Sequence, residues 1–184
     1  MNPDVEAVSP ASPRRVRRSD MCSANPKPRG ARLALAIQMA SRSDEIPARA
    51  QLRKWARAAL DGPASITLRI VDEAEAQALN RDYRGKNYPT NVLTFAYPGA
   101  GQLRADIVLC APVITREAEQ QGKPVAAHFA HLVVHGTLHA RGYDHASGKQ
   151  ARVMESIESA IVKNLGYADP YAKAGVGRRK ASAR

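Results

Sequence analysis

Residues 131–145 read HLVVHGTLHARGYDH, and this segment predicts a helix that ends in a turn. A step of four residues turns a helix by about 400°, so His135 and His139 project from the same face, one turn apart. Gly142 can adopt a positive φ, which lets the chain leave the helix and swing His145 back toward the other two. Three imidazoles are therefore expected to converge at the end of one helix.

Outward from this segment, the apolar pattern predicts strands mixed with helices. Period-two alternation indicates strands over 32–38, 66–71, 92–95 and 106–110. Helical spacing indicates helices over 47–60, after Asp72, over 112–121, from about 125, and over 147–165. A capping box is expected for the pairs Asp72 with Glu75 and Ser147 with Gln150. The polar stretch 83–91 is expected to be a loop.

This order of elements predicts one domain over 32–171 of the α+β (α/β-like) class. Its small mixed β-sheet is flanked by helices, and its metal site lies at the end of a helix. Residues 1–31 are rich in Pro, Ser, Arg and Ala without periodicity, which predicts a disordered basic tail. Residues 172–184 form a second basic tail.

The positive charge of the chain is concentrated at its two ends. Residues 1–32 carry seven basic and three acidic side chains, and residues 172–184 carry five basic and no acidic ones. The segment between them holds only +2 of the net charge of +11. Basic tails can hold RNA or another acidic surface, but solvated tails have the same composition, so charge leaves both interpretations open.

Composition excludes several classes of protein. A hydrophobic content of 44% is ordinary for a soluble domain, and no run approaches eighteen consecutive apolar residues, so no membrane span is expected. The N-terminal arginines precede no apolar stretch, which argues against a secretory signal. The two cysteines, Cys22 and Cys110, form no disulfide framework and are typical of a reducing cytoplasm.

The three converging imidazoles have the chemistry of a catalytic zinc site. Two histidines one helical turn apart can bind one ion at about 2.0–2.1 Å, and a third nitrogen ligand leaves the fourth position open. We therefore expect one zinc ion per chain, held by His135, His139 and His145. Histidine sites also accept nickel and copper, so the residues alone leave the metal open. His131 and Asp144 are expected to support these ligands through hydrogen bonds, or to serve in the core and in a turn.

The same spacing occurs in a class of zinc proteases, whose first histidine is followed directly by a glutamate that acts as general base. Here that position is Gly136. Peptide hydrolysis by that route therefore lacks its base.

Three motifs in order resemble the YbeY family of bacterial endoribonucleases. They are the histidine segment 131–145, the loop YRGKNYPTNVLTF at 83–95, and the ending LGYADPY at 165–171. The resemblance spans about 32–171. Ala105 departs from the family pattern, which usually has glycine before Asp106; we expect this to affect only the entry to a strand.

The resemblance implies a metal-dependent hydrolase, a single-strand-specific endoribonuclease acting in rRNA processing and ribosome biogenesis. It implies roles in the maturation of the 3′ end of 16S rRNA and in ribosome quality control. The expected partners are ribosomal RNA and the small ribosomal subunit, and DNA is not an expected partner. It places the zinc ligands on His135, His139 and His145, and the functionally important arginine of the family on Arg84.

The residues also make RNA a plausible substrate. Arg84 can donate two hydrogen bonds to a phosphate, and Lys86 adds a nearby positive charge. Two alternatives stay open: a metalloprotease or other zinc hydrolase, and a non-enzymatic ribosome-binding assembly factor with a structural metal.

Overall fold

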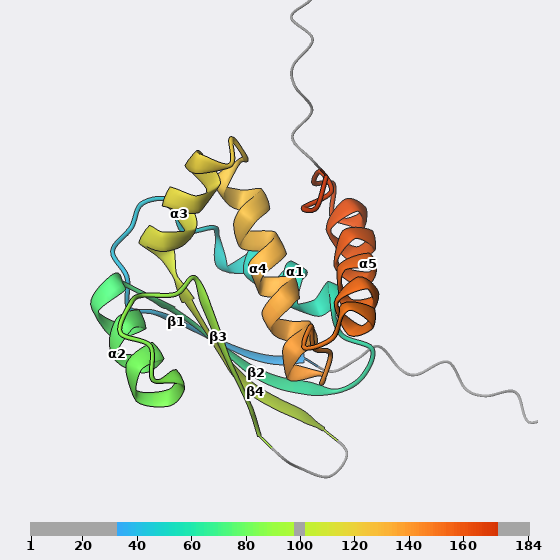
Figure 1. Cartoon of the computed structure of the whole chain (residues 1–184), viewed down its shortest axis with the longest axis horizontal. Coiled ribbons are helices and arrows are strands. Elements are labelled where there is room, and N and C mark those ends of the chain that lie inside the picture. The colour runs from blue at the N-terminus through green and yellow to red at the C-terminus, as the bar shows by residue number, and fades with distance from the viewer. Residues whose placement is uncertain (1–32, 98–101, 173–184) are drawn as a thin grey trace, which may run out of the picture.

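The computed structural model of the chain describes residues 33–97 and 102–172. The predicted tails, 1–31 and all but the first residue of 172–184, lie outside these ranges, so their disorder and the domain boundaries stay predictions. Within the described ranges the chain forms one α+β domain with a mixed sheet, which confirms the predicted class (Figure 1). Its elements are β1 (Leu33–Met39), α1 (Arg49–Ala58), β2 (Ala64–Val71), α2 (Glu73–Arg84), β3 (Val92–Tyr97), β4 (Leu103–Cys110), α3 (Ala111–Gln120), α4 (Val125–Ala140) and α5 (Gly148–Asn164).

The four strands lie in the order β1-β2-β4-β3. β1 and β2 are parallel, β2 and β4 are parallel, and β3 joins the edge antiparallel to β4. The register pairs Thr94 of β3 with Ile107 of β4, so both side chains lie on one face of the sheet. This pairing places β3 beside the helix that carries the histidines.

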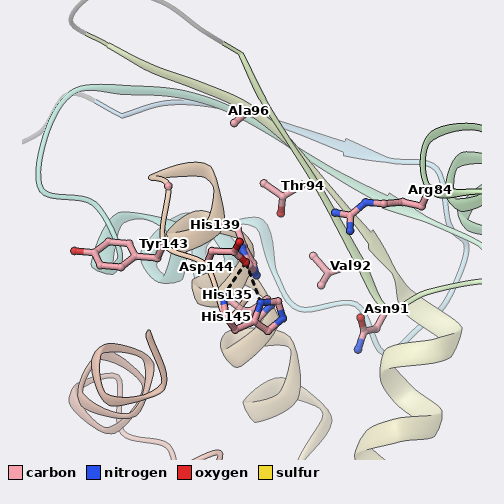
Figure 2. A pocket seen from close by; sticks show the side chains of 11 residues that line it. Arg84, Asn91, Val92, Thr94, Ala96, His135, His139, Tyr143, Asp144 and His145 are labelled. Atoms are coloured by element: carbon pink, nitrogen blue, oxygen red, sulfur yellow. Dashed lines mark hydrogen bonds and ion pairs between the residues drawn. The ribbon is translucent and has the colours of Figure 1, made fainter. Parts of the chain in front are cut away.

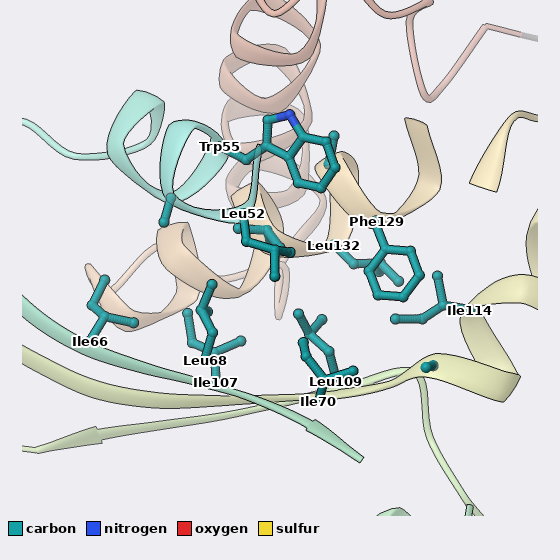
Figure 3. Packing of buried hydrophobic residues seen from close by; sticks show 14 of the residues in the cluster. Leu52, Trp55, Ile66, Leu68, Ile70, Ile107, Leu109, Ile114, Phe129 and Leu132 are labelled. Atoms are coloured by element: carbon teal, nitrogen blue, oxygen red, sulfur yellow. The ribbon is translucent and has the colours of Figure 1, made fainter. Parts of the chain in front are cut away.

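The main core lies between that face of the sheet and helices α1 and α4 (Figure 3). Alternate residues of β2 and β4 enter it, and Trp55, Phe129 and Leu132 pack on them from the helices. Since α4 is buried along most of its length, it contacts the sheet, α1, α3 and α5. The histidines at its C-terminal end therefore lie on a helix that is packed against neighbours on several sides.

Helix α2 packs on part of the opposite face of the sheet, against β4. Val108 and Cys110 of β4, which alternate with the residues of the main core, pack there with Leu93 and Ala76. Ala105, the departure from the family pattern, is buried inside β4. No helix within the described ranges is long and apolar enough to cross a membrane.

The structure corrects the local prediction at the end of α2. Arg84, expected in a loop, is the last residue of this helix, and Gly85 ends the helix with a φ of 67°. The capping box expected at its start does not form, because the Asp72 carboxylate accepts a hydrogen bond from Ser41. Glu75 is instead paired with a neighbouring strand residue, Arg69, at 2.6 Å.

Helix α5 agrees with the prediction only in part. Ser147 caps it by accepting a hydrogen bond from the backbone N–H of Gln150 at 3.3 Å, but the reciprocal half of the expected capping box does not form, because Oε1 of Gln150 accepts from the Ser147 hydroxyl at 2.7 Å. The predicted apolar stripe contained Met154 and, further on, Ile157, Ile161 and Leu165. The fully buried residues are Met154, Glu158 and Val162, so the helix is rotated relative to the predicted stripe and buries a carboxylate.

Candidate metal centre

The histidines converge at the C-terminal end of α4, as the spacing predicts (Figure 2). His135 and His139 lie one turn apart with ring centroids separated by 4.5 Å. Gly142 adopts a φ of 90°, and the chain then returns to place the ring of His145 4.9 Å from that of His139. The positive φ at this position is what the glycine was expected to supply.

The donor atoms of these three residues fit a metal ion. One ring nitrogen from each of His135, His139 and His145 lies within 4.8 Å of the other two. Two nitrogens bound at about 2.0–2.1 Å in a tetrahedron stand roughly 3.4 Å apart, a spacing that small rotations of the rings would reach. Three neutral imidazoles match the ligands of a catalytic zinc site, although nickel and copper bind the same donors.

The surroundings of His139 favour an imidazole that is free to bind a metal. Burial lowers the pKa of His139, and the neighbouring His135 and His145 lower it further because two close imidazolium groups repel. A lower pKa leaves His139 neutral at pH 7, with a lone pair available to a cation.

A cleft of about 560 Å³ lies in front of the histidines. Its wall is formed by the end of α2, the edge strand β3 and the turn after α4 (Figure 2). It is lined by Arg84, Asn91, Val92, Thr94, Ala96, His135, His139, Gly142, Tyr143, Asp144 and His145.

The two basic residues expected to meet RNA lie differently. Arg84 extends from the end of α2 into the cleft, on the side facing the histidines (Figure 2). Lys86, two residues further, is exposed and stands outside the lining of the cleft, among the described residues.

Gly136 lets α4 approach the sheet closely. A Cβ at this position would lie 2.8 Å from Cγ2 of Ile107 and 3.1 Å from Oγ1 of Thr94. The position thus faces β3 and β4 and has no room for a side chain. A protease-type glutamate here would collide with the sheet.

A buried carboxylate behind the cluster was missed by the sequence analysis. Glu158 of α5 is 0% exposed, and its Oε1 lies 2.8 Å from Nδ1 of His135. Its Oε2 lies 3.2 Å from Nε2 of His131 and accepts a hydrogen bond from the Tyr171 hydroxyl. Burial alone would raise its pKa, but these hydrogen bonds outweigh burial and hold the pKa of Glu158 at about 2. The carboxylate is therefore ionised.

A signal for Glu158 was present in the sequence. It stands four residues after Met154 and four before Val162, so a helix places it in line with two apolar residues. Glutamate is almost never fully buried unless it has partners. A carboxylate in an apolar stripe, in a chain with clustered histidines, indicates such a partnership.

The two residues expected to support the ligands reach different surroundings. His131 contacts Glu158 and the Tyr171 ring, at 5.5 Å between ring centroids. Of the three clustered histidines it meets His135, with ring centroids 6.0 Å apart. Asp144 accepts a hydrogen bond from the backbone N–H of His145 at 2.7 Å and lies 3.2 Å from its Nδ1. These hydrogen bonds lower the pKa of the Asp144 carboxyl.

His128 lies apart from the cluster. It is buried, and its Nε2 is 2.7 Å from the Glu117 carboxylate, which also accepts a hydrogen bond from Asn91 at 2.9 Å. Asn91 lines the cleft, so the buried His128 and the partly exposed Glu117 support one wall of it.

Comparisons with known proteins agree with the three motifs. The family described as Endoribonuclease YbeY matches residues 37–166. A protein named Endoribonuclease YbeY from Aromatoleum aromaticum is 51% identical over 153 residues, which cover 82% of this chain and 99% of that protein. Proteins of the same name from Methylobacillus flagellatus and Nitrosomonas europaea are 56% and 54% identical, over 94% and 85% of their lengths and 76% of this chain.

Proposed function

Because the chain belongs to the endoribonuclease YbeY family, we propose that it cleaves single-stranded ribosomal RNA at one zinc ion held by His135, His139 and His145. The observation that carries the proposal is the convergence of these three rings with Arg84 on one cleft. The chain is an endoribonuclease by family, and the proposal concerns its metal, its residues and its substrate. We further propose maturation of the 3′ end of 16S rRNA, a role in ribosome quality control, and the cytoplasm as its location.

The residues of the cleft have different roles toward a phosphodiester. A bound zinc ion supplies Lewis-acid stabilisation of negative charge on a phosphoryl oxygen. The Arg84 guanidinium offers two parallel N–H donors to the nonbridging oxygens, where charge develops as the P–O bond breaks. Asp144 holds the ring of His145, the most exposed of the three histidines. With an ion held by the three histidines, positive charge from the ion and from Arg84 would face a phosphate in the cleft.

The metal is tested by cleavage of single-stranded rRNA fragments with the purified full-length chain, with and without chelator. We expect one zinc per chain by metal analysis, loss of cleavage on chelation, and recovery on addition of zinc. His139→Ala should lose both metal and cleavage. Cleavage that survives chelation and this substitution would come from a contaminating nuclease and would remove the proposal.

The role of Arg84 is tested by two matched substitutions on α2. Arg84→Ala should lower kcat/KM by about 10²–10³-fold, the usual effect of removing a donor to developing charge. Arg81→Ala provides the control, because Arg81 lies on the same helix, is exposed and pairs with Asp82. Equal activity of the two variants would remove Arg84 from the mechanism.

The non-enzymatic alternative, a ribosome-binding factor with a structural metal, is distinguished by His135→Ala. A variant that keeps its fold without metal but fails in cleavage and in ribosome maturation argues against a purely structural ion. The partners proposed are ribosomal RNA and the small subunit. If the basic tails contribute, removal of 1–31 and 172–184 should weaken RNA association and flatten its dependence on salt. Unchanged binding would show that the tails are passive.

A further inference from the structure

The carboxylate of Glu158 connects a metal-ligand candidate to the C-terminal end of the described chain. One oxygen faces Nδ1 of His135 at 2.8 Å. The other accepts from the Tyr171 hydroxyl and lies 3.2 Å from His131. Both oxygens of a fully buried carboxylate are therefore used by side chains from α4 and from the segment after α5.

The segment 166–171 is itself held in place by polar contacts. Asp169 accepts hydrogen bonds from the Ser159 hydroxyl at 2.8 Å and from the backbone N–H of Tyr171 at 3.1 Å. The Lys123 ammonium, from the turn before α4, donates to the Pro170 carbonyl at 2.9 Å. These contacts tie the segment to α5 and to the start of α4, so the Tyr171 hydroxyl is delivered to Glu158 by a fixed backbone.

We propose that Glu158 and Tyr171 are positioning residues for the metal site, and that the ending 165–171 serves this purpose. In this arrangement His135 donates its Nδ1–H to Glu158, which leaves Nε2 as the nitrogen that binds the ion. The hydrogen bond from the Tyr171 hydroxyl fixes the orientation of the carboxylate, so that its other oxygen faces Nδ1 of His135. The inference rests on the proposed function, because it assumes that the ion binds at the three histidines.

The physical basis is the choice between two tautomers of imidazole. A neutral histidine carries its proton on either nitrogen, and the hydrogen bond made by one nitrogen decides which is free to bind metal. Carboxylates that accept this hydrogen bond commonly contribute a factor of about 10–100 to metal affinity. Tyr171 lies outside the lining of the cleft, so its effect should reach the metal without touching RNA.

A different assignment is possible for the same atoms. His131, His135 and Glu158 also lie within 4.8 Å of one another and could hold an ion of their own. The hydrogen bond from Tyr171 to Glu158 and the complete burial of that carboxylate favour a hydrogen-bonded network. Both groups contain His135, so a second ion would have to replace the proton on its Nδ1 while the first binds Nε2. The network therefore predicts one zinc per chain, and the second site predicts two.

The test compares three full-length variants: Glu158→Gln, Tyr171→Phe and, as control, Tyr167→Phe. Tyr167 lies in the same segment and packs edge-on against Trp55, with ring centroids 6.0 Å apart. Zinc affinity is measured by competition with a chelator. We expect it to fall about 10–100-fold in Glu158→Gln, several-fold in Tyr171→Phe, and not at all in the control.

A second measurement reports the positioning itself. Nitrogen NMR of the metal-free protein should show His135 protonated at Nδ1 in the wild type and the control, and a mixture of tautomers in Glu158→Gln. Circular dichroism establishes that each variant folds. Tyr171→Phe removes one oxygen from a partly exposed side chain, so it keeps the test valid if Glu158→Gln does not fold.

The outcomes separate this inference from the function it rests on. If the wild type binds zinc through His135 but Tyr171→Phe and a folded Glu158→Gln bind it equally well, the positioning role is wrong and the metal site stands. If the wild type binds no zinc, or if His135→Ala binds zinc as well as the wild type does, both proposals are wrong. Two zinc ions per chain, reduced to one by His131→Ala, would overturn the network in favour of a second site.

Discussion

Replacing Gly136 with alanine should destabilise the protein, although alanine is the better helix former. Gly136 lies in the interior of α4, where alanine would contribute about 1 kcal/mol through helix propensity. The added Cβ would stand 2.8 Å from Cγ2 of Ile107, well inside the optimal carbon–carbon separation of about 3.5–4.0 Å. The sign of the result depends on whether the sheet can move.

The sheet has little room to yield at this point. Ile107 is fully buried on β4, which is hydrogen-bonded to β2 on one side and β3 on the other. The neighbouring Thr94 would also be 3.1 Å from the new Cβ. Overpacking of this kind costs about 1–3 kcal/mol, and we place it at the upper end, about 2–3 kcal/mol. After the gain in propensity, the free energy of unfolding should fall by about 1–2 kcal/mol.

The assay is urea denaturation of the metal-free protein, with the melting temperature as a second readout. For a domain of this size the expected loss corresponds to a fall in Tm of about 3–7 °C. Gly148→Ala is the matched control: it is exposed at the start of α5 with no atom near its Cβ, and should be neutral or slightly stabilising. Gly136→Glu should cost more than the alanine, because a whole charged side chain would enter the core.

The contact with Ile107 can be isolated by a double-mutant cycle. Ile107→Ala removes the methyl group that the new Cβ would strike, so Gly136→Ala should lose most of its penalty in that background. The reasoning is refuted if Gly136→Ala is as stable as the wild type, or if its penalty is unchanged when Ile107 is alanine.

Further predictions concern groups that hold the walls of the site. Although burial opposes it, hydrogen bonds from His128 and others lower the pKa of Glu117 below its usual 4.5. The ionised Glu117 carboxylate therefore stabilises the fold fully above pH 4.5, and this contribution is lost as the pH falls through the depressed pKa. The free energy of unfolding of the metal-free wild type should accordingly approach that of Glu117→Gln on acidification. A difference between the two proteins that does not change with pH would contradict this. Arg141 donates to the buried Ala59 carbonyl at 2.8 Å, and Arg141→Ala should cost about 1–3 kcal/mol in urea denaturation. Ser147→Ala removes the side-chain cap of α5 and should lower the free energy of unfolding by about 1 kcal/mol. An unchanged Tm would show that this cap does not stabilise the protein.

Local periodicity was a reliable guide to the elements because the alternation of buried and exposed side chains repeats every two residues in a strand and about every 3.6 in a helix. The four strands and five helices lie close to where alternation and helical spacing place them. Prediction failed where a longer-range partner competed for a side chain. Asp72 was expected to cap α2, but Ser41, 31 residues away, takes its carboxylate. Arg84 was placed in a loop because Gly85 follows it, whereas that glycine ends the helix one residue later.

What the sequence determined by itself is the histidine cluster, because its geometry is local. The four-residue step places two rings on one helix face, and the glycine that follows permits the return of the third. Their identity as metal ligands stays a prediction, but their convergence needed no knowledge of the rest of the chain.

Only the tertiary structure decided what surrounds that cluster. The carboxylate behind His135 comes from a helix 23 residues further along the chain, and the hydroxyl that holds it from 13 residues beyond that. The packing of α4 on the sheet leaves no space for a side chain at Gly136, and the packing of α2 on the other face brings Arg84 to the opposite wall of the cleft. These contacts depend on how helices and strands distant in sequence pack together, which no local pattern specifies.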